Sequence, residues 1–344
     1  MKKLLSLVLV LALTFSLSAG VMAEEIKDAK ETAEYVTAVE YPLTVKDQAD
    51  REVTLEKEPE SLVSCYYISS SLLMALGLGD RIVGIENNPE TRPIYALSDE
   101  KLLELQPIGT AKEIDLEACA KLAPELAVIP MKVKDSAEDL ENLGINVIIV
   151  NPESKELLAE MISTVAEATN TVERGNQLIA YIDEKEAELT KKLEKADTPK
   201  VYLASNSAFL ATAGNKMYQS DLIKLAGGVN VAEEIEDTYW AEVDYEQILT
   251  WDPEYIILPS SAKYTVDEVL ADEVLADCTA VKNGNVYQIP GDIESWDSPV
   301  PSSFLGAYYV AGVLHPELVS EKDFDEAVKD YYETFYNFEE EKKN

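Results

Sequence analysis

The stretch IDLEACAKLAPELAVIP at 114–130 returns as VDYEQILTWDPEYIILP at 243–259. The copies share five identities in one register: Asp115 with Asp244, Glu117 with Glu246, Pro124 with Pro253, Glu125 with Glu254, and Pro130 with Pro259. In each copy the aspartate stands where a helix N-cap is wanted, and the glutamate falls in the first turn, where the helix dipole favours negative charge. The apolar end of each copy is typical of a buried strand. The repeat predicts two similar halves of the chain. In each half a short helix ends at the first proline and leads into a strand.

The sequence around the two copies alternates between strand-like and helix-like stretches. Strands are expected at 61–65, 81–86, 145–150, 201–205 and 285–290, after a hairpin formed by 43–47 and 52–55. Helices are expected at 69–79, with serine caps before it, and at 137–144, 218–228, 302–316 and 324–336. Alternation of this kind predicts α/β layers with mostly parallel sheets.

One segment breaks the alternation. Asn151 and Pro152 suit a helix start, and no proline follows before Lys195. Apolar residues step through this segment by three and four, so the spacing predicts one continuous helix of about 60 Å at 1.5 Å per residue. Gly175 is the point where such a helix could break. The fold class expected is α/β, with two α/β lobes of mostly parallel sheet joined by one long interlobe α-helix.

The first residues have the pattern of an export signal. Lys2 and Lys3 precede an apolar run at 4–17, and Val21-Met22-Ala23 fits the small-x-small cleavage pattern. No cysteine lies near that point for a lipid anchor, so an unanchored periplasmic protein is expected. The expected divisions are a signal peptide at 1–23, an acidic leader at 24–41, a first lobe at 42–151, the interlobe helix at 152–196 and a second lobe at 197–344.

The composition is strongly acidic, with a formal net charge of −36. A polyanion of this kind is repelled by nucleic acid and by anionic membrane surfaces, so a nucleic-acid partner is not expected. The three cysteines, Cys65, Cys119 and Cys278, are widely spread and are expected to be small buried hydrophobes. No Gly-x-Ser-x-Gly, phosphate-binding loop or His-Glu-x-x-His occurs, and His315 is the single histidine, so an enzyme is not expected.

Five stretches carry a resemblance to a known family: LGLGDRIVGI at 76–85, DLEACAKLAPELAVI at 115–129, DLIKLAGGVNVAEE at 221–234, WAEVDYEQILTWDPEYIIL at 240–258 and ESWDSPVPSSFLGAYYVAGVLHPE at 294–317. Together with the long helix, they resemble the periplasmic binding proteins that serve iron-siderophore, haem and cobalamin ABC importers. The resemblance implies a ligand held between two lobes and a partner that is an inner-membrane permease dimer. It also implies that Glu117 and Glu246 dock onto permease arginines, with Glu113 and Glu242 as the nearest substitutes.

Ligand-binding residues are expected at strand ends that face the cleft between the lobes. In the first lobe these are Tyr66, Tyr67, Ser69, Arg92, Tyr95, Met131 and Lys132. In the second lobe they are Asn206, Tyr218, Tyr239, Trp240, Ser260, Lys263 and Trp296. Aromatic rings suit a planar macrocycle or an aryl chelate, and the cationic side chains suit carboxylates or anionic siderophores.

A single histidine cannot build the several-histidine site of a naked zinc or manganese ion. The expected ligand is therefore a preformed metal complex, and the resemblance implies a ferric siderophore, haem or cobalamin. No intrinsic cofactor is expected. Haem would need an axial tyrosine, with Tyr66, Tyr67 and Tyr239 as candidates. The alternatives left open are another small solute, such as an oxyanion, a sugar or a peptide, and a carboxylate-dependent envelope enzyme.

Overall fold

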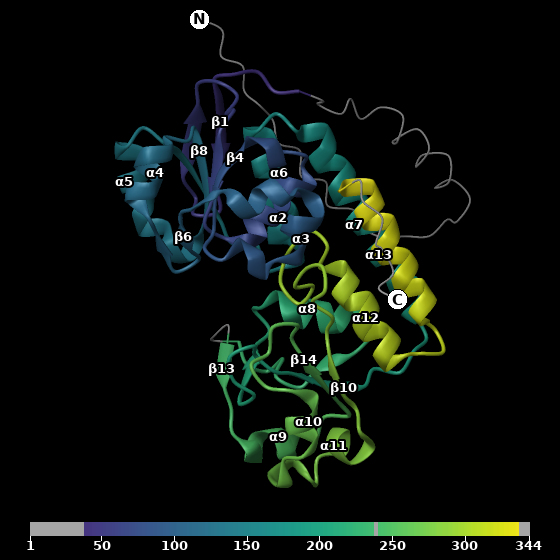
Figure 1. The fold of residues 1–344 in the computed structure, drawn as a ribbon. Helices are drawn as coiled ribbons and strands as arrows, with labels where there is room; N and C mark the ends of the chain where they lie inside the picture. The colour runs from purple at the N-terminus through teal and green to yellow at the C-terminus, as the bar shows by residue number, and fades with distance from the viewer. Residues whose placement is uncertain (1–37, 237–239, 337–344) are drawn as a thin grey trace, which may run out of the picture. The chain divides into compact units, whose positions relative to one another are not determined.

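The computed structural model describes residues 38–236 and 240–336 (Figure 1). The predicted signal peptide and most of the acidic leader lie outside these ranges. The described part of the chain contains no helix that is both long enough and apolar enough to cross a membrane. Its two main sheets are separate, and they fall within the first and second lobes predicted from the sequence.

The sheet of the first lobe is parallel throughout. Its strands, in spatial order, are β5 (Gln106–Pro107), β4 (Ile82–Ile85), β3 (Leu62–Ser64), β8 (Leu126–Pro130) and β9 (Asn146–Val150). Its helices are α2 (Tyr67–Ala75), α3 (Pro93–Ser98), α4 (Leu116–Leu122) and α5 (Ala137–Asn142). Every residue of β8 is buried, as expected for a strand covered on both faces. Beside this sheet, β1 (Leu43–Lys46) and β2 (Glu52–Leu55) form the predicted antiparallel hairpin.

The sheet of the second lobe repeats this order. Its parallel strands are β12 (Val229–Asn230), β10 (Lys200–Leu203), β14 (Tyr255–Leu258) and β15 (Val286–Gln288). Its helices are α8 (Tyr218–Leu225), α9 (Tyr245–Trp251), α10 (Val266–Leu270) and α11 (Thr279–Asn283). In chain order, β10, β12, β14 and β15 correspond to β3, β4, β8 and β9. The α/β class and the internal repeat are thus both present.

The segment predicted as one long helix is two helices, α6 (Lys155–Ala168) and α7 (Val172–Leu193). The break lies in Thr169-Asn170-Thr171, where Asn170 adopts a left-handed conformation with φ of 56°. These three residues are poor helix formers, which explains the position of the break. Gly175 is not the break. It lies inside α7, and a Cβ there would come within 2.6 Å of the Cβ of Ala166, so glycine allows α6 and α7 to pack closely.

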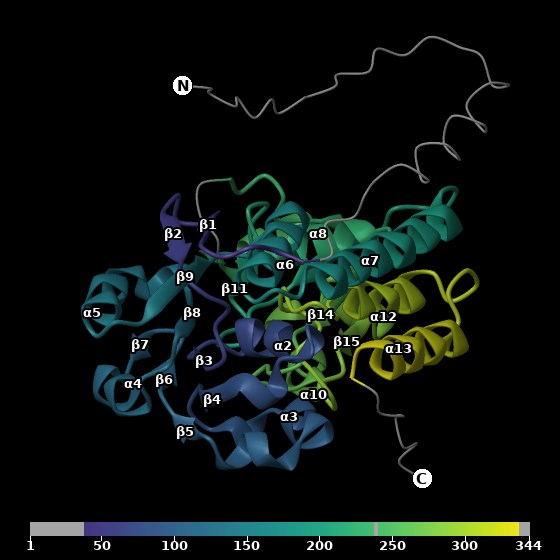
Figure 2. The same cartoon turned by 90° about the horizontal axis from the view of Figure 1, so that it is seen from above.

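Helix α7 still connects the two lobes. Near its start, Arg174 donates through Nε to the carbonyl oxygen of Ala75 in α2, at 3.1 Å. Near its end, the side chain of Leu193 packs close to Gly227, which follows α8. The closing helices α12 (Phe304–Leu314) and α13 (Glu321–Phe335) pack beside it, and α7 and α13 run side by side in both views (Figure 2).

Helix α13 forms a second connection across the junction, which the sequence did not reveal. Arg174 donates through one Nη to the carbonyl oxygen of Phe335 at 2.9 Å. Just beyond α13, the hydroxyl of Tyr336 lies 3.3 Å from the carbonyl oxygen of Ser71 in α2. The C-terminal end of the second lobe is therefore bonded to the first helix of the first lobe.

Candidate functional site

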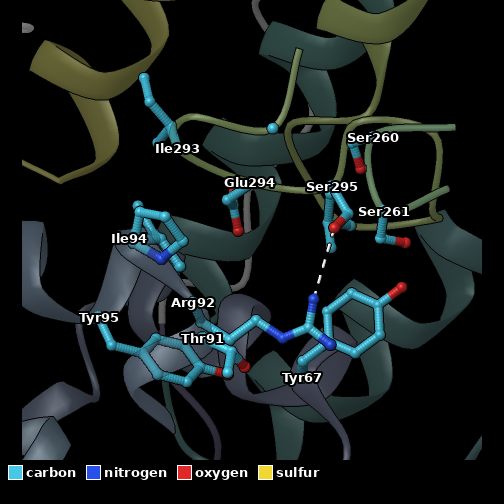
Figure 3. Close-up of a pocket in the computed structure, with 13 residues that line it drawn as sticks. Tyr67, Thr91, Arg92, Ile94, Tyr95, Ser260, Ser261, Ile293, Glu294 and Ser295 are labelled. Carbon is cyan, nitrogen blue, oxygen red and sulfur yellow. Dashed lines mark hydrogen bonds between the residues drawn. The ribbon is translucent and has the colours of Figure 1, made fainter. Parts of the chain in front are cut away.

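A pocket of about 170 Å³ lies between the two lobes (Figure 3). Its lining residues are Tyr67, Thr91, Arg92, Pro93, Ile94 and Tyr95 from the first lobe, and Ser260, Ser261, Gly291, Ile293, Glu294, Ser295 and Val300 from the second. These residues follow β3, β4, β14 and β15, so the pocket is formed at the carboxyl ends of parallel strands. This is the place where open α/β sheets bind ligands.

Arg92 supplies a positive charge to this pocket. It is the N-cap residue of α3, and the proline that follows it starts the helix. Its guanidinium lies 4.1 Å from the centre of the Tyr67 ring, and one Nη donates to the Oγ of Ser295 across the junction at 3.4 Å (Figure 3). Among the described residues, no carboxylate lies within ion-pair distance of it. The guanidinium is thus oriented by an aromatic ring and a hydroxyl, and no carboxylate of the described residues forms an ion pair with it.

A buried carboxylate of the first lobe lies behind the pocket. Glu86 follows β4 and is 6% exposed. It accepts hydrogen bonds from Ser70 Oγ at 2.8 Å and from the hydroxyl of Tyr95, a lining residue. Burial raises the pKa of Glu86, while these hydrogen bonds and the charge of Arg92 lower it by less.

A second buried carboxylate, Glu294, comes from the other lobe and lines the pocket itself. It is 6% exposed and accepts hydrogen bonds from the hydroxyls of Ser71 in α2, Ser302 before α12 and Tyr332 in α13, the last at 2.9 Å. Burial raises its pKa, again against the opposing effect of these hydrogen bonds and of Arg92. Glu294 thereby joins both lobes and α13 at one edge of the pocket.

Ser260 is held in place by a third buried acid. Its backbone N–H and its Oγ both donate to Oδ1 of Asp297, at 3.0 and 2.6 Å. Gln219 of α8 in turn donates through Nε2 to the carbonyl oxygen of Asp297 at 2.8 Å. The hydroxyl-bearing wall of the second lobe is therefore fixed by the segment around Asp297.

Four of the predicted ligand residues meet at this pocket, namely Tyr67, Arg92, Tyr95 and Ser260. Tyr66 contacts the Tyr67 ring edge-on with centroids 5.7 Å apart. Ser69 is buried inside α2, and its Oγ lies 2.9 Å from that of Ser64. The serines expected to cap α2 in fact lie within it, because the helix begins at Tyr67.

The structure does not bring the other predicted residues to the pocket. Tyr218 is buried and hydrogen-bonds Ser303 at 2.7 Å. Trp296 is also buried, and its Nε1 donates to the hydroxyl of Tyr332 at 3.0 Å. The polar residues next to Trp296 in the sequence suggested a loop that faces the cleft. Instead, α13 covers the indole ring, and no local sequence pattern indicates this contact.

The remaining predicted residues lie elsewhere on the lobes. Met131 and Lys132 begin a short 3-10 helix after β8, and Met131 lines a separate hollow beside the β1–β2 hairpin. Asn206 and Lys263 are exposed, and the backbone N–H of Lys263 donates to the carbonyl oxygen of Asn206 at 3.0 Å. Trp240 is 39% exposed at the start of β13 (Trp240–Glu242). Tyr239 lies outside the described residues.

Several residues that line the pocket were not predicted from the sequence. These are Thr91, Pro93, Ile94, Ser261, Gly291, Ile293, Glu294, Ser295 and Val300. A signal for some of them was present, because the loops after β4 and β15 follow the same strand-end rule as Arg92 and Ser260. Glu86 and Glu294 also follow these two strands, but their burial beside the pocket could not be predicted, because it depends on how the two lobes pack.

The repeated stretch at 114–130 and 243–259 forms a helix start of the same kind in each lobe. Asp115 Oδ1 accepts from the backbone N–H of Ala118 at 2.9 Å, and Asp244 Oδ1 accepts from that of Gln247 at 2.8 Å. The next acidic residues, Glu117 and Glu246, are exposed, and no ion pair of either is found within the described ranges. The helices end in left-handed residues immediately before the prolines.

A small antiparallel ribbon precedes each of these helices. In the first lobe it is β6 (Gly109–Thr110) with β7 (Glu113–Ile114), and in the second it is β11 (Ala211–Ala213) with β13. A hollow of about 410 Å³ next to the first ribbon includes Glu113, and one of about 370 Å³ next to the second includes Glu242. The two lobes thus present similar acidic surfaces around Glu117 and Glu246.

Comparison with known families decides the identity of this architecture. The model of the family described as periplasmic binding protein matches residues 62–293, which is more than half of the chain. The chain belongs to the periplasmic binding protein family. This family consists of extracytoplasmic substrate-binding proteins of ABC transporters rather than of enzymes.

Individual relatives of this periplasmic binding protein cover nearly its whole length. An uncharacterized ABC transporter substrate-binding lipoprotein, YvrC of Bacillus subtilis, is 27% identical over 318 residues, or 91% of this chain and 97% of the relative. The molybdate-binding protein MolA of Haemophilus influenzae is 22% identical over 319 residues, or 85% and 90%. A cobalamin-binding protein of Halobacterium salinarum is 23% identical over 285 residues, or 81% and 74%.

The fold is shared with solved structures of the family. The structure of MolA of Haemophilus influenzae bound to molybdate aligns with a TM-score of 0.77 at 21% identity, covering 87% of this chain and 99% of that one. The Bacillus relative is named a lipoprotein, which is at odds with the expectation of an unanchored protein. In this chain the first cysteine is Cys65, a buried residue beside β3, so that expectation stays a prediction.

Proposed function

We propose that this periplasmic binding protein captures a compact anionic solute, of the size and charge of a tetrahedral oxyanion, in the pocket at Arg92. The observation that carries the proposal is a guanidinium without an ion-pair partner among the described residues, placed among hydroxyl groups in a cavity of about 170 Å³. Charge-assisted hydrogen bonds from arginine to an oxyanion are strong and directional. The hydroxyls of Ser261 and Ser295 supply neutral donors on the opposite wall, whereas the hydroxyl proton of Ser260 is already donated to Asp297.

The size of the pocket favours a compact ligand. Sites for drug-sized ligands have volumes of roughly 300–1,000 Å³, whereas a cavity of about 150 Å³ holds a molecule as small as benzene. The protein as a whole is strongly acidic, so a local arginine is needed for an anion to bind. The relative named a molybdate-binding protein supports this ligand class.

A metal chelate, the ligand class favoured by the sequence, is the second candidate. The adjacent rings of Tyr66 and Tyr67 at the cleft favour it, as does the relative named a cobalamin-binding protein. A haem, a cobalamin or a ferric siderophore is larger than this cavity, so its binding requires the lobes to separate. In that case Arg92 would contact an anionic edge of the chelate.

We further propose delivery of the solute to an ABC permease dimer through Glu117 and Glu246. The two glutamates lie at equivalent positions of two similar lobes, which suits a partner made of two similar subunits. Exposed carboxylates next to acidic hollows are complementary to arginines on such a partner. Neither glutamate lines the ligand pocket, so docking and capture are separate tasks of the surface.

The test is a titration of the purified protein, followed by tryptophan fluorescence and by calorimetry. Molybdate, sulfate, cobalamin, haem and a panel of ferric siderophores are compared at matched concentrations. Saturable binding of an oxyanion with one site per chain supports the first candidate. Binding of a chelate alone would replace it with the second, and binding of neither would contradict both.

A further inference from the structure

Two buried carboxylates, one from each lobe, flank Arg92, and neighbouring serines of α2 hold them both. Ser70 Oγ donates to Glu86 at 2.8 Å, and the hydroxyl of the next residue, Ser71, donates to Glu294. Glu294 and Tyr95 line the pocket (Figure 3). The hydroxyl of Tyr95 donates to Glu86. No step of capture or docking described above needs a carboxylate at either position, and acids beside an anion site are unfavourable when ionised.

The surroundings of Glu86 contain one cation. The groups that face it are the hydroxyls of Ser70 and Tyr95, the guanidinium of Arg92, and, more weakly, the thiol of Cys65. Its own position after β4 ties it to the first lobe. Burial raises the pKa of Glu86, because water no longer stabilises the ionised form.

Arg92 also acts on Glu294. Besides Arg92, the groups that face it are the hydroxyls of Ser71, Ser302, Tyr331, Tyr332 and Tyr336, from α2, from the segment before α12, and from α13 with the residue that follows it. Burial raises the pKa of Glu294 as well. When both glutamates are protonated, Glu86, Glu294 and Arg92 together carry a net charge of about +1, which comes from Arg92. With both ionised, they carry about −1.

The position of Glu294 relative to Arg92 depends on how the two lobes pack. Beside Glu294, the backbone N–H of Ile94 donates to the carbonyl oxygen of Ile293 at 3.1 Å, and Arg92 donates to Ser295. Three consecutive residues of the second lobe, 293–295, are therefore bonded to the first lobe. This packing places the second carboxyl group in the lining of the pocket.

We infer that Glu86 and Glu294 determine the charge of the solute that the pocket accepts, because they bind protons when an anion occupies the site at Arg92. This inference rests on the proposed anion site. A bound dianion disfavours ionised carboxylates next to it, so anion binding and proton uptake favour each other by linkage. The affinity for a dianion is then highest at low pH, and it falls as the pH rises through the raised pKa values of Glu86 and Glu294.

The test uses the full mature protein and molybdate between about pH 6 and pH 8, where molybdate stays a dianion. Calorimetry in buffers of different ionisation enthalpy measures the protons taken up, and needs no variant. We expect proton uptake on binding, and an affinity that falls with rising pH by up to about tenfold per pH unit for each linked proton. Binding without proton uptake and without pH dependence would overturn the inference and leave the anion site standing.

Variants assign the effect to the two residues. Glu86→Gln and Glu294→Gln keep the size of the side chain and remove its ionisation, so each should reduce the proton uptake and raise the affinity at the high-pH end. The control is Glu186→Gln, because Glu186 is a buried glutamate of α7, 6% exposed, that pairs with Lys155 and does not line this pocket. If Glu294→Gln fails to fold, Glu86→Gln and the wild-type calorimetry decide the matter. Absence of molybdate binding at every pH, by wild type and variants alike, would overturn the anion site and this inference together.

Discussion

Asp115 and Asp244 have the same structural role 129 positions apart: each side chain accepts a hydrogen bond from the backbone N–H three residues on, at 2.9 and 2.8 Å. Each thereby fixes the start of a short helix whose first turn exposes a glutamate, Glu117 or Glu246. The repeated stretch is thus a repeated local structure, and it places two carboxylates at equivalent points of the two lobes.

Charge reversal at these two points tests docking. The double variant Glu117→Lys with Glu246→Lys should abolish transport in a cell that depends on the cognate permease, because two attractive contacts become repulsive. Its affinity for the solute should stay within about twofold, since the helices lie away from the pocket. The matched control is Glu138→Lys with Glu273→Lys, which reverses one exposed first-turn glutamate in each lobe. Transport by the first double variant at the level of the control would contradict the assignment.

Close packing behind the pocket gives a second prediction. A Cβ at Gly306 in α12 would come within 2.5 Å of the carbonyl oxygen of Trp296, and this backbone adjoins Glu294 and Ser295. Gly306→Ala should therefore lower the free energy of unfolding by about 1–3 kcal/mol and weaken solute binding as the loop shifts. On the same helix, a Cβ at Gly312 meets its nearest atom at 3.4 Å. Gly312→Ala should leave binding unchanged and stability equal or higher. Urea unfolding and calorimetry measure both effects, and equal behaviour of the two variants would show that this contact is unimportant.

The buried pair also predicts a pH dependence of stability. The pKa values of Glu86 and Glu294 are raised above the ordinary value of 4.5 in the folded state. Their contribution to stability is fully present below the unfolded-state pKa and is lost as the pH rises through the folded-state pKa. Relative to wild type, the double variant Glu86→Gln with Glu294→Gln should therefore gain stability as the pH rises from about 5 to about 8. Urea unfolding at three pH values in that range gives the difference, and a constant difference would be the contrary result.

Closure on the solute should be small. Helix α7 connects the lobes, and α13 pairs with it through Lys185 and Asp330 at 3.0 Å and reaches α2 beyond its C-terminal end. Two packed helices across one junction allow a tilt more readily than a wide swing. Small-angle scattering with and without saturating solute should show a change in radius of gyration of about 1 Å or less. A contraction of several ångströms would contradict this rigid connection.

The sequence predicted much of this fold because its signals are local. Apolar runs such as 126–130 and 145–150 became buried parallel strands, and the repeat predicted two similar halves, in each of which a short helix leads into a strand. The prediction of one continuous helix was wrong. The helical spacing of apolar residues continues across Thr169–Thr171, although Asn170 adopts a left-handed conformation and interrupts the helix. Gly175 attracted the prediction of a break, but its role is close contact with α6.

The site was predictable only in part, because strand ends are visible in the sequence but contacts between distant residues are not. Arg92 and Ser260 follow strand ends, which the sequence shows, and both line the pocket. Trp296 is in the neighbouring loop but is covered by α13, so its burial depends on a contact with Tyr332 that lies 36 positions away. The bond between Ser71 and Glu294 spans 223 positions and exists only once both lobes are packed.

The most direct test of the account is a calorimetric titration of molybdate into wild type and Arg92→Met at about pH 6. The methionine keeps much of the apolar stem and its contact with Tyr67 but removes the charge. The account predicts saturable binding at one site in wild type, and a loss of affinity of about 10- to 100-fold or more in the variant, since hydrogen bonds to charged groups contribute about 1.5–3 kcal/mol. The control is Arg81→Met, which removes an arginine paired with Glu58 outside the pocket and should bind as wild type does. Equal affinity of wild type and Arg92→Met, or no binding by wild type, would contradict the claim that Arg92 anchors an anionic solute.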